Sequence, residues 1–322
     1  MEGKGILMKY VRFKARNLAL AGFILLSTMA SGYAQSILRM DNAGCIGGLE
    51  YLAKLLKIEI TPATSPRKVI GKCDAQAVEV VAGGSGVTLR AERITWNRNG
   101  LAPLGDGQMP QQLQLEMRGV KVTNAPATDS AWDYLVDYGR SGRAFDAALD
   151  FGYTADSGVL DLAGISLDFH SGNTARLSAR LRGVAPAFPK SPEIGVFPLI
   201  IDNLTVAINS RETRKNPLLE LGVAMLKGKI PNGDIDGFRS LASLYVATEL
   251  SKVISENNLA SVNKLVSDLP DLKGDLLLHL AAAEGYPVLR FGLWSTGQKP
   301  AEMLEGVSVE ARYSPNLFDV VN

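Results

Sequence analysis

The sequence contains few of the residues on which most enzymes and metal sites depend. Only two histidines and two cysteines occur among its 322 residues. It has no G-x-S-x-G nucleophile elbow, H-E-x-x-H zinc helix or phosphate-binding P-loop. His170 and His279 have no acid or nucleophile at a motif spacing, so we interpret both as structural or solvated residues. The sequence therefore predicts a non-enzymatic protein without a cofactor or a metal site.

Charge of one sign is not in excess either. The whole chain has a formal net charge of +1, and this becomes slightly negative once the basic N-terminal head is removed. A protein that contacts many phosphates needs a basic surface, so no nucleic-acid partner is expected. Beyond residue 34, no segment is apolar over the roughly 20 residues that a membrane-spanning helix requires.

The first 34 residues follow the order of a secretory signal peptide. A basic head, Lys4–Arg16, precedes the uncharged apolar run Leu18–Leu26, and small residues then lead to Gly32-Tyr33-Ala34. We expect cleavage after Ala34, a mature protein that begins at Gln35, and a periplasmic location. The alternative is a retained membrane anchor, although polar residues dilute the segment that follows the apolar run.

The cysteines Cys45 and Cys73 are close in sequence and have no other cysteine to pair with. In an exported chain such a pair is most simply a disulfide, which would stabilise the fold by about 3 kcal/mol. A metal site is the weaker alternative, because neither histidine lies near a cysteine in sequence.

Helical periodicity comes first in the mature chain. The apolar residues at 46, 49, 53 and 56 predict an amphipathic helix over Cys45–Lys57. Pro62 and Pro66 are expected to end regular structure after it. From Val78 the period changes to two, which is typical of half-buried strands.

Strands predominate from there to the middle of the chain. Val87–Trp96 is one, with a phase slip near Arg93 that a bulge would explain. Residues 113–118 form another, and a short helical stripe follows at 132–136. Residues 145–184 predict a three-stranded meander of Phe145–Tyr153, Leu160–Phe169 and Ala175–Leu181.

A similar arrangement is predicted near the C-terminus. In chain order it consists of a strand at Leu199–Asn209, helices at Pro217–Lys227 and Phe238–Leu269, a strand at Asp275–Ala283, a turn at 284–287, and strands at Val288–Trp294 and Val307–Tyr313.

We therefore predict a mainly β protein with helices, of the α+β class. It should contain an extended curved antiparallel sheet, built of two similar strand–helix–meander halves and covered by helices. The alternative to a true duplication is that any antiparallel protein looks similar to itself along the chain. The expected divisions are a signal peptide at 1–34, an N-terminal helical segment with the disulfide at 35–77, a first β-rich half at 78–185, a Pro-rich linker at 186–198 and a second half at 199–322.

Two polar patterns have alternative interpretations. Asn232–Gly237 resembles the front of a calcium loop, but the twelfth position is Ser243 rather than glutamate. Asp234 is better explained as part of a helix start. The arginines at 176, 180 and 182 put positive charge on one face of a strand, which predicts a solvated face or, alternatively, a site for an anionic head group or glycan.

Two phrases carry a resemblance at the level of pattern. They are Leu160-Asp161-Leu162-Ala163-Gly164-Ile165-Ser166-Leu167 and Ala175-Arg176-Leu177-Ser178-Ala179-Arg180-Leu181. With the strand–helix–meander layout, which spans much of residues 78–313, they resemble the β-repeat regions of AsmA-like bacterial envelope proteins. The resemblance implies an extended curved sheet with an apolar inner surface and a role in outer-membrane biogenesis or lipid handling. Because the chain is short and is expected to lose its anchor, it implies a soluble carrier or accessory protein rather than a bridge between membranes.

We therefore expect a periplasmic protein that binds an apolar or amphipathic, lipid-like ligand or assists assembly of the cell envelope. The candidate ligand-facing residues are Phe145, Leu149, Phe151, Leu276, Leu278 and Leu280. One alternative is a module that binds envelope proteins, which an exposed apolar patch over a filled core would favour. Another is a glycan or lipid hydrolase, which a buried carboxylate pair would favour. A cavity lined by apolar strand faces would favour the carrier.

Overall fold

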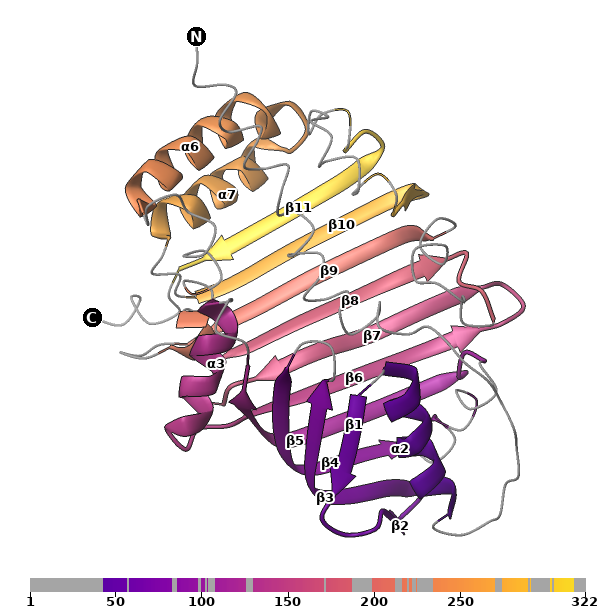
Figure 1. Ribbon diagram of the computed structural model, residues 1–322. Helices are drawn as coiled ribbons and strands as arrows, with labels where there is room; N and C mark the ends of the chain where they lie inside the picture. Colours follow the sequence, from indigo (N-terminus) through magenta and orange to yellow (C-terminus); the bar gives the residue numbers. More distant parts are fainter. Residues whose placement is uncertain are drawn as a thin grey trace.

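The computed structural model is dominated by one large, open, antiparallel sheet with helices packed on it (Figure 1). Its strands lie in the order β1-β3-β4-β5-β6-β7-β8-β9-β10-β11, and β2 pairs with β3. The spatial order follows the chain almost throughout, so most neighbouring strands are also consecutive in sequence. The prediction of a mainly β protein with helices and one extended antiparallel sheet is confirmed.

The predicted signal peptide, residues 1–34, and most of the predicted linker lie outside the residues that the structure describes. The described residues are 43–56, 58–82, 86–97, 100–101, 103, 108–125, 130–170, 172–186, 199–211, 216–218, 220–221, 224, 234–269, 274–288, 290, 302 and 304–315.

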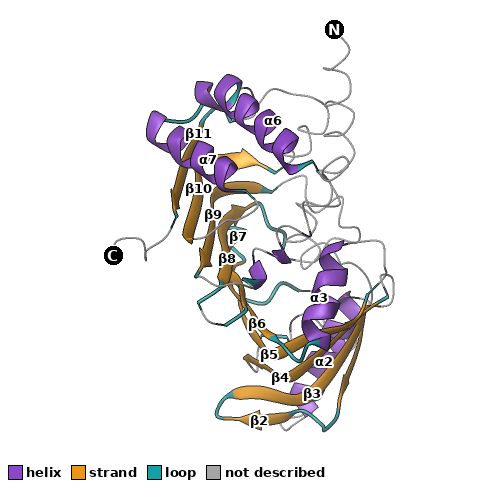
Figure 2. Cartoon of the chain, turned by 90° about the vertical axis from the view of Figure 1, so that its left-hand side faces the viewer, coloured by secondary structure: helices purple, strands orange, loops and turns teal. Residues whose placement is uncertain are grey.

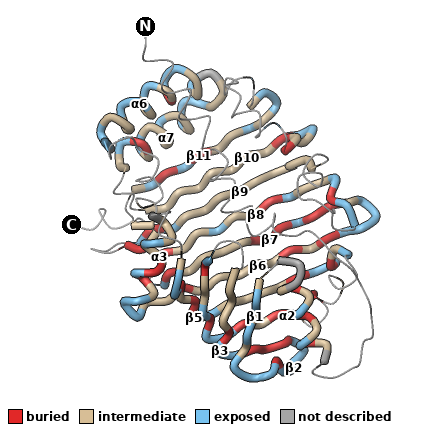
Figure 3. The backbone as a smooth tube through the Cα atoms, in the orientation of Figure 1, coloured by how far each residue is buried: buried red, intermediate tan, exposed pale blue. Residues whose placement is uncertain are grey.

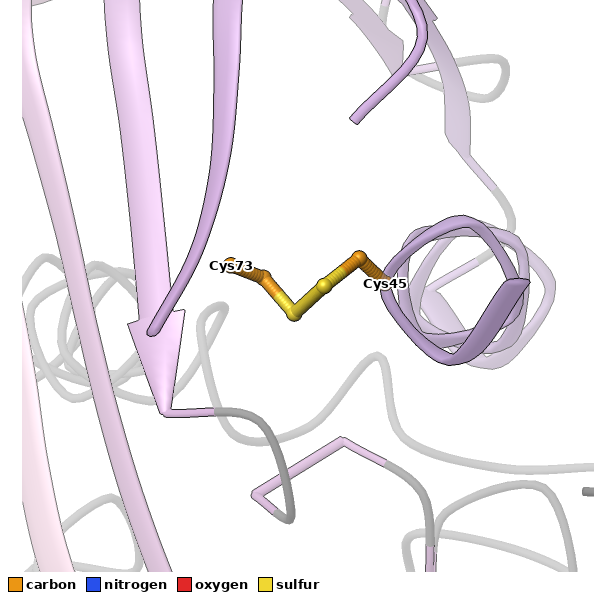
Figure 4. The surroundings of a disulfide bond; sticks show 2 residues. All are labelled: Cys45 and Cys73. Atoms are coloured by element: carbon orange, nitrogen blue, oxygen red, sulfur yellow. A yellow bond between two sulfur atoms is a disulfide. The ribbon is translucent and has the colours of Figure 1, made fainter. Parts of the chain in front are cut away.

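Helix α2 (Ala43–Leu56) is tied to strand β3 (Lys72–Ala82) by a disulfide. Cys45 in the first turn of the helix bonds to Cys73 on the strand, with their Cα atoms 5.5 Å apart (Figure 4). Gly48 lets the helix approach closely, because a Cβ at this position would lie only 3.2 Å from the Cβ of Leu101. Both the predicted helix and the predicted disulfide are confirmed.

Two short strands follow α2 and were not expected. β1 (Ile58–Pro62) and β2 (Arg67–Val69) pair with opposite ends of β3. The prolines do interrupt regular structure as predicted, because β1 ends at Pro62 and β2 begins only after Pro66, but the two strands themselves were missed. Pro62 is the last residue of a strand at the edge of the sheet, a position where the missing N–H removes no ladder bond.

Strands β4 (Val87–Asn97) and β5 (Gln112–Asn124) continue the sheet. The predicted phase slip near Arg93 is present, and β3 shares it. On β3 the exposed residues 76 and 77 lie between the buried Ala75 and Val78, and on β4 the exposed residues 92 and 93 lie between the buried Ala91 and Ile94. Both strands therefore change face at this point, while their register is preserved. On β5 the same row contains Gly119, whose φ of +61° favours glycine.

The predicted three-stranded meander is confirmed. Helix α3 (Ser130–Arg140) leads into β6 (Phe145–Thr154), β7 (Val159–Asp168) and β8 (Thr174–Arg182). A register shift between the pairs Asp150–Gly164 and Phe151–Leu162 marks the phase change that the sequence placed at Gly164.

The C-terminal half begins with β9 (Ile200–Ser210). The described positions of the predicted helix at 217–227 are helical. The stretch predicted as one helical segment at 238–269 consists of α6 (Ile235–Thr248), the 3₁₀ turn η3 (Leu250–Lys252) and α7 (Glu256–Asp268). Asp234 caps α6 by accepting a hydrogen bond from the Gly237 N–H at 2.9 Å, as expected from the cap interpretation.

Strand β10 (Gly274–Pro287) contains the positions that the sequence predicted as a turn. The glycine and the change of phase at 284–287 belong instead to an irregularity, where the register against β9 shifts between Ala281 and Tyr286. β10 pairs directly with β11 (Val307–Ser314). Most of the strand predicted at 288–294 lies outside the described residues. A second three-stranded meander is therefore not confirmed.

The sheet is curved, and helices α2 and α3 lie inside its curve (Figure 2). Helices α6 and α7 lie at the other end, where α7 packs against β11 and α6 packs against α7. Asn258 on α7 donates a hydrogen bond to the Val309 carbonyl at 2.7 Å and accepts one from the Ala311 N–H at 3.0 Å. The helix thereby satisfies backbone groups of β11 at the edge of the sheet.

Candidate functional site

The most extensive feature of the sheet is one apolar face that crosses nearly all of its strands. Residues directly opposite each other in paired strands project to the same side of the sheet. Three rows of such partners are apolar from end to end, and together with Phe145 we call them the apolar face. The first row is Cys73, Trp96, Leu115, Leu149, Ile165, Leu177, Val206, Leu278 and Ala311.

The second and third rows flank the first. The second is Ala75, Ile94, Met117, Ala147, Leu167, Ala175, Ile208, Leu276 and Tyr313, and the third is Leu113, Phe151, Leu162, Ala179, Leu204, Leu280 and Val309. No polar side chain interrupts these rows, so the inner surface of the curve is continuous hydrocarbon, apart from the Tyr313 hydroxyl and the Trp96 ring nitrogen.

Burial along the apolar face differs between its ends and its middle. Cys73 and Trp96 are 0% and 1% exposed at the β3–β4 end, and Ala311 is 4% exposed on β11. Between them, Leu177, Val206 and Leu278 are all of intermediate exposure. Figure 3 shows this contrast as a predominantly tan band over β9 and β10 between regions richer in buried residues.

The packing of the helices explains this gradient. α2 packs on β1 and β2, α3 packs on β5, and α7 packs on β11. Among the described elements, no helix makes comparably extensive contacts with β7 to β10. The middle of the apolar face therefore keeps some of its hydrocarbon accessible.

The six candidate ligand-facing residues all lie on this face but differ in accessibility. Phe145 and Phe151 are only 8% and 6% exposed and belong to the packed core. The four leucines, at 149, 276, 278 and 280, are of intermediate exposure. The structure thus joins the two predicted sets into one surface, through β7, β8 and β9.

The residues that link these sets were not singled out from the sequence. Leu177 and Val206 occupy the centre of the first row, on β8 and β9. Their alternation was visible in the sequence, but only strand register shows that they connect Leu149 with Leu278. Register depends on pairing partners that a single sequence does not specify.

The described residues enclose a small recess at one end of the face. It has a volume of about 10 Å³, close to the space that one water molecule needs. Its lining comes from β9, β10, β11 and the segment before β11, namely Ile201, Asp202, Leu280, Ala281, Ala282, Tyr286, Leu304 and Val307. A recess of this size does not hold an amphipathic chain, so a ligand of that class would lie along the open face.

The opposite face of the sheet is polar and largely paired. Arg182 Nε lies 2.6 Å from Asp202 Oδ1, and Arg180 lies 3.6 Å from Asp161 and 3.8 Å from Asp202. His279 Nδ1 and Thr205 Oγ1 are 2.8 Å apart on the same side. Two of the three arginines that suggested an anion site therefore have carboxylate partners, and Arg176 donates to the Ala163 carbonyl.

Three tyrosines near the apolar face have a raised pKa. Burial raises the pKa of Tyr138, and it also raises the pKa of Tyr286. Desolvation raises the pKa of Tyr134 still more, and the nearby Glu220 carboxylate adds to this rise. These hydroxyls are therefore neutral at physiological pH, and they add no charge to the margin of the face.

Two further searches concern the described part of the chain. It contains no group of three or more histidine, cysteine or acidic side chains arranged to hold a metal ion. None of its helices combines the length and the hydropathy needed to cross a membrane.

Comparison with known proteins adds no assignment: no protein-family model matches the chain, and a search of the curated proteins found no significant match.

Proposed function

We propose that the protein is a non-enzymatic carrier that binds an apolar or amphipathic, lipid-like ligand along the apolar face, or that it serves envelope assembly through such binding. One observation carries this proposal: the three apolar rows stay unbroken across β6 to β11 while their middle stays partly exposed. Leaving apolar surface in water costs about 25 cal/mol per Å². A bound hydrocarbon chain would remove that cost.

The proposed location is the periplasm, after removal of residues 1–34. Support comes from the order of basic head, apolar run and small residues, and from a disulfide that suits an oxidising compartment. The pattern-level resemblance to AsmA-like envelope proteins points in the same direction. Intact-mass measurement of the periplasmic fraction should give a chain that begins at Gln35, and a full-length species held in the membrane would contradict this.

Ligand binding can be measured directly on the delipidated protein. A polyene fatty acid that fluoresces in apolar surroundings should bind saturably to the wild type. Leu177→Glu places a charge in the middle of the apolar face and should weaken binding by at least about tenfold, because a buried charge without a partner is costly. Ser178→Glu is the matched control, since Ser178 is next in sequence and lies on the polar face.

The two variants distinguish the apolar face from general effects of charge. Both proteins should retain the wild-type circular dichroism spectrum, because both sites are partly exposed on the same strand. Equal affinity in both variants would rule out the apolar face as the binding surface. Absence of saturable binding to the wild type would exclude the carrier function itself.

A second candidate function is a protein-interaction module, and one observation favours it. Leu241 and Leu244 on α6 are 48% and 60% exposed and lie almost one turn apart. Large apolar side chains in such a position can serve as a docking site for another protein. If the wild type binds no lipid, crosslinking in the periplasm from position 241 would test this function. Only a specific crosslinked protein that is lost when Leu244→Ser is added to the crosslinking variant would support it.

A further inference from the structure

The segment between α3 and β6 holds a fixed arginine at the margin of the apolar face. The guanidinium carbon of Arg143 lies 4.3 Å from the centre of the Tyr138 ring, within the range of a cation–π contact. Its Nε donates to Ser141 Oγ at 2.9 Å, and that hydroxyl donates to the Tyr138 carbonyl at 2.7 Å. Two contacts therefore hold the Arg143 side chain in place, one with the ring of Tyr138 and one with the hydroxyl of Ser141.

Aromatic contacts connect this arginine to the sheet. Tyr138 meets Phe169 edge to face with the ring centres 5.5 Å apart, and Phe169 stacks on Phe145 at 5.2 Å. Phe145 is the first residue of β6 and lies on the apolar face. The three rings are each less than 9% exposed. The positive charge thus lies directly beside buried hydrocarbon that continues into the rows of the sheet.

Arg143 lacks the carboxylate partner that several arginines of the polar face have. Arg90, Arg93 and Arg182 each pair with a carboxylate. Among the residues that the structure describes, no carboxylate forms an ion pair with Arg143, and its only hydrogen bond there uses Nε. The two terminal nitrogens of the guanidinium are the pair that can grip the two oxygens of a carboxylate or phosphate.

The carboxylate of Glu220 lies close to the tyrosines of α3. Glu220 acts electrostatically on both Tyr134 and Tyr138. This carboxylate would repel an anionic group that approached the tyrosines, so its removal provides a second, independent measure of the sign of the ligand's charge.

We propose that Arg143 binds the anionic head group of an amphiphile whose hydrocarbon chain lies on the apolar face. The head group is a carboxylate or a phosphate, the two anions whose geometry suits a guanidinium. This inference rests on the proposed carrier function, and it adds the class of ligand and the end of the strands at which the head group lies.

The test compares two probes that differ only in the head group. A polyene fatty acid and the fatty alcohol of the same chain are titrated into the delipidated wild type and into Arg143→Gln. Loss of a charged hydrogen bond should weaken binding of the acid by about tenfold to a hundredfold, and binding of the alcohol should stay unchanged. Glu220→Gln should strengthen binding of the acid and leave binding of the alcohol unchanged, because it removes a carboxylate that would repel the head group.

Two matched arginines serve as controls. Arg140→Gln removes a nearby charge that pairs with Asp137 at 3.4 Å and should not affect either probe. Arg290 lies 5.8 Å from the centre of the Tyr286 ring, after the last residue of β10, and so beyond the other end of the strands. If Arg290→Gln rather than Arg143→Gln weakens binding of the acid, the head group lies at that end and the proposal is wrong.

Other outcomes are equally decisive. If the acid and the alcohol bind the wild type equally, or if Arg143→Gln weakens both alike, the arginine does not recognise the head group, while the carrier function stands. If neither probe binds, the carrier function fails as well. If inorganic phosphate in large excess displaces the acid without displacing the alcohol, a free anion and the head group bind at the same site. If phosphate displaces neither probe, the hydrocarbon chain is needed for binding.

Discussion

At the β3–β5 end of the sheet the apolar face contributes most of its residues to a packed core, whereas over β8–β10 most of them are only partly buried. The same rows pass through both regions, and the residues are of the same kinds. Leu113 is 2% exposed on β5, while Leu177 on β8 is of intermediate exposure. The difference comes from what covers each region: α2, its disulfide and α3 at one end, and no comparably packed described helix in the middle.

This contrast shows that the apolar character of a strand face and its burial are separate properties. Alternation decides which side of a strand is apolar. It does not decide whether that side becomes core or surface, because this depends on helices that lie elsewhere in the chain. The proposed carrier function would need both regions, since the packed end stabilises the fold and the open middle would provide the surface for a ligand.

The largest effect is expected from truncation at the packed end. Leu113→Ala should lower the free energy of unfolding by about 3–5 kcal/mol, because a fully buried leucine leaves a cavity. Urea denaturation followed by circular dichroism measures it. A loss below about 1 kcal/mol would show that this end is not a packed core.

Removal of the disulfide should have the next largest effect. Replacing both Cys45 and Cys73 by alanine should lower the free energy of unfolding by about 3 kcal/mol, because the unfolded chain gains freedom over a sequence separation of 28 residues. Differential scanning calorimetry without reductant measures the difference. Addition of reductant to the unfolded wild type should reproduce most of this difference. An unfolding temperature that is the same in the variant and the wild type would contradict a stabilising disulfide between α2 and β3.

Truncation in the middle of the face should cost much less. Leu177→Ala should lower the free energy of unfolding by about 1–2 kcal/mol, since only part of the side chain leaves an apolar environment. The same urea experiment as for Leu113→Ala provides a direct comparison on one face of one sheet. Equal losses at the two positions would mean that the middle is packed in solution, and the contrast would then be lost.

A smaller effect on the free energy of unfolding is expected at the edge strand β11. Asn258→Ala removes two side-chain hydrogen bonds to the backbone of the strand and should cost about 1 kcal/mol. Hydrogen exchange at the Ala311 amide should become faster. Asn257→Ala is the matched control. Asn257 is the preceding residue and its side chain is exposed, so its truncation should leave both the stability and the exchange rate unchanged.

The smallest expected effect is a dependence on alkaline pH. The raised pKa of Tyr134 means that the folded state favours the neutral hydroxyl. The associated stability is present below the unfolded pKa of about 10 and declines as the pH rises above it. Tyr134→Phe should flatten this decline in urea denaturation series, and identical slopes for variant and wild type would argue against a buried hydroxyl.

Much of the secondary structure could be predicted from local patterns. The strands from β4 to β9, the helix that carries Cys45 and the disulfide follow from alternation, helical spacing and an isolated cysteine pair. β1 and β2 were missed because they are short and lie beside prolines. The irregularity near Gly285 was misread as a turn, because a glycine with a phase change is the same local signal in both cases.

The candidate site was predictable only in pieces. The apolar sides of β6 and β10 were identified, but Leu177 and Val206, which join them, were not. Arg143 gave no signal at all, because the role proposed for it depends on the contact of Tyr138 with Phe169, which lies 26 positions beyond Arg143 in the chain. Contacts of this kind are absent from any local pattern.

Residue type and spacing were enough to predict strands with one apolar side and a pair between Cys45 and Cys73. The register that aligns the apolar rows from β3 to β11, and the packing of α2, α3 and α7 near the two ends of these rows, could be learned only from the folded chain. Register and helix packing arise from interactions between distant segments, whereas alternation acts within a single strand.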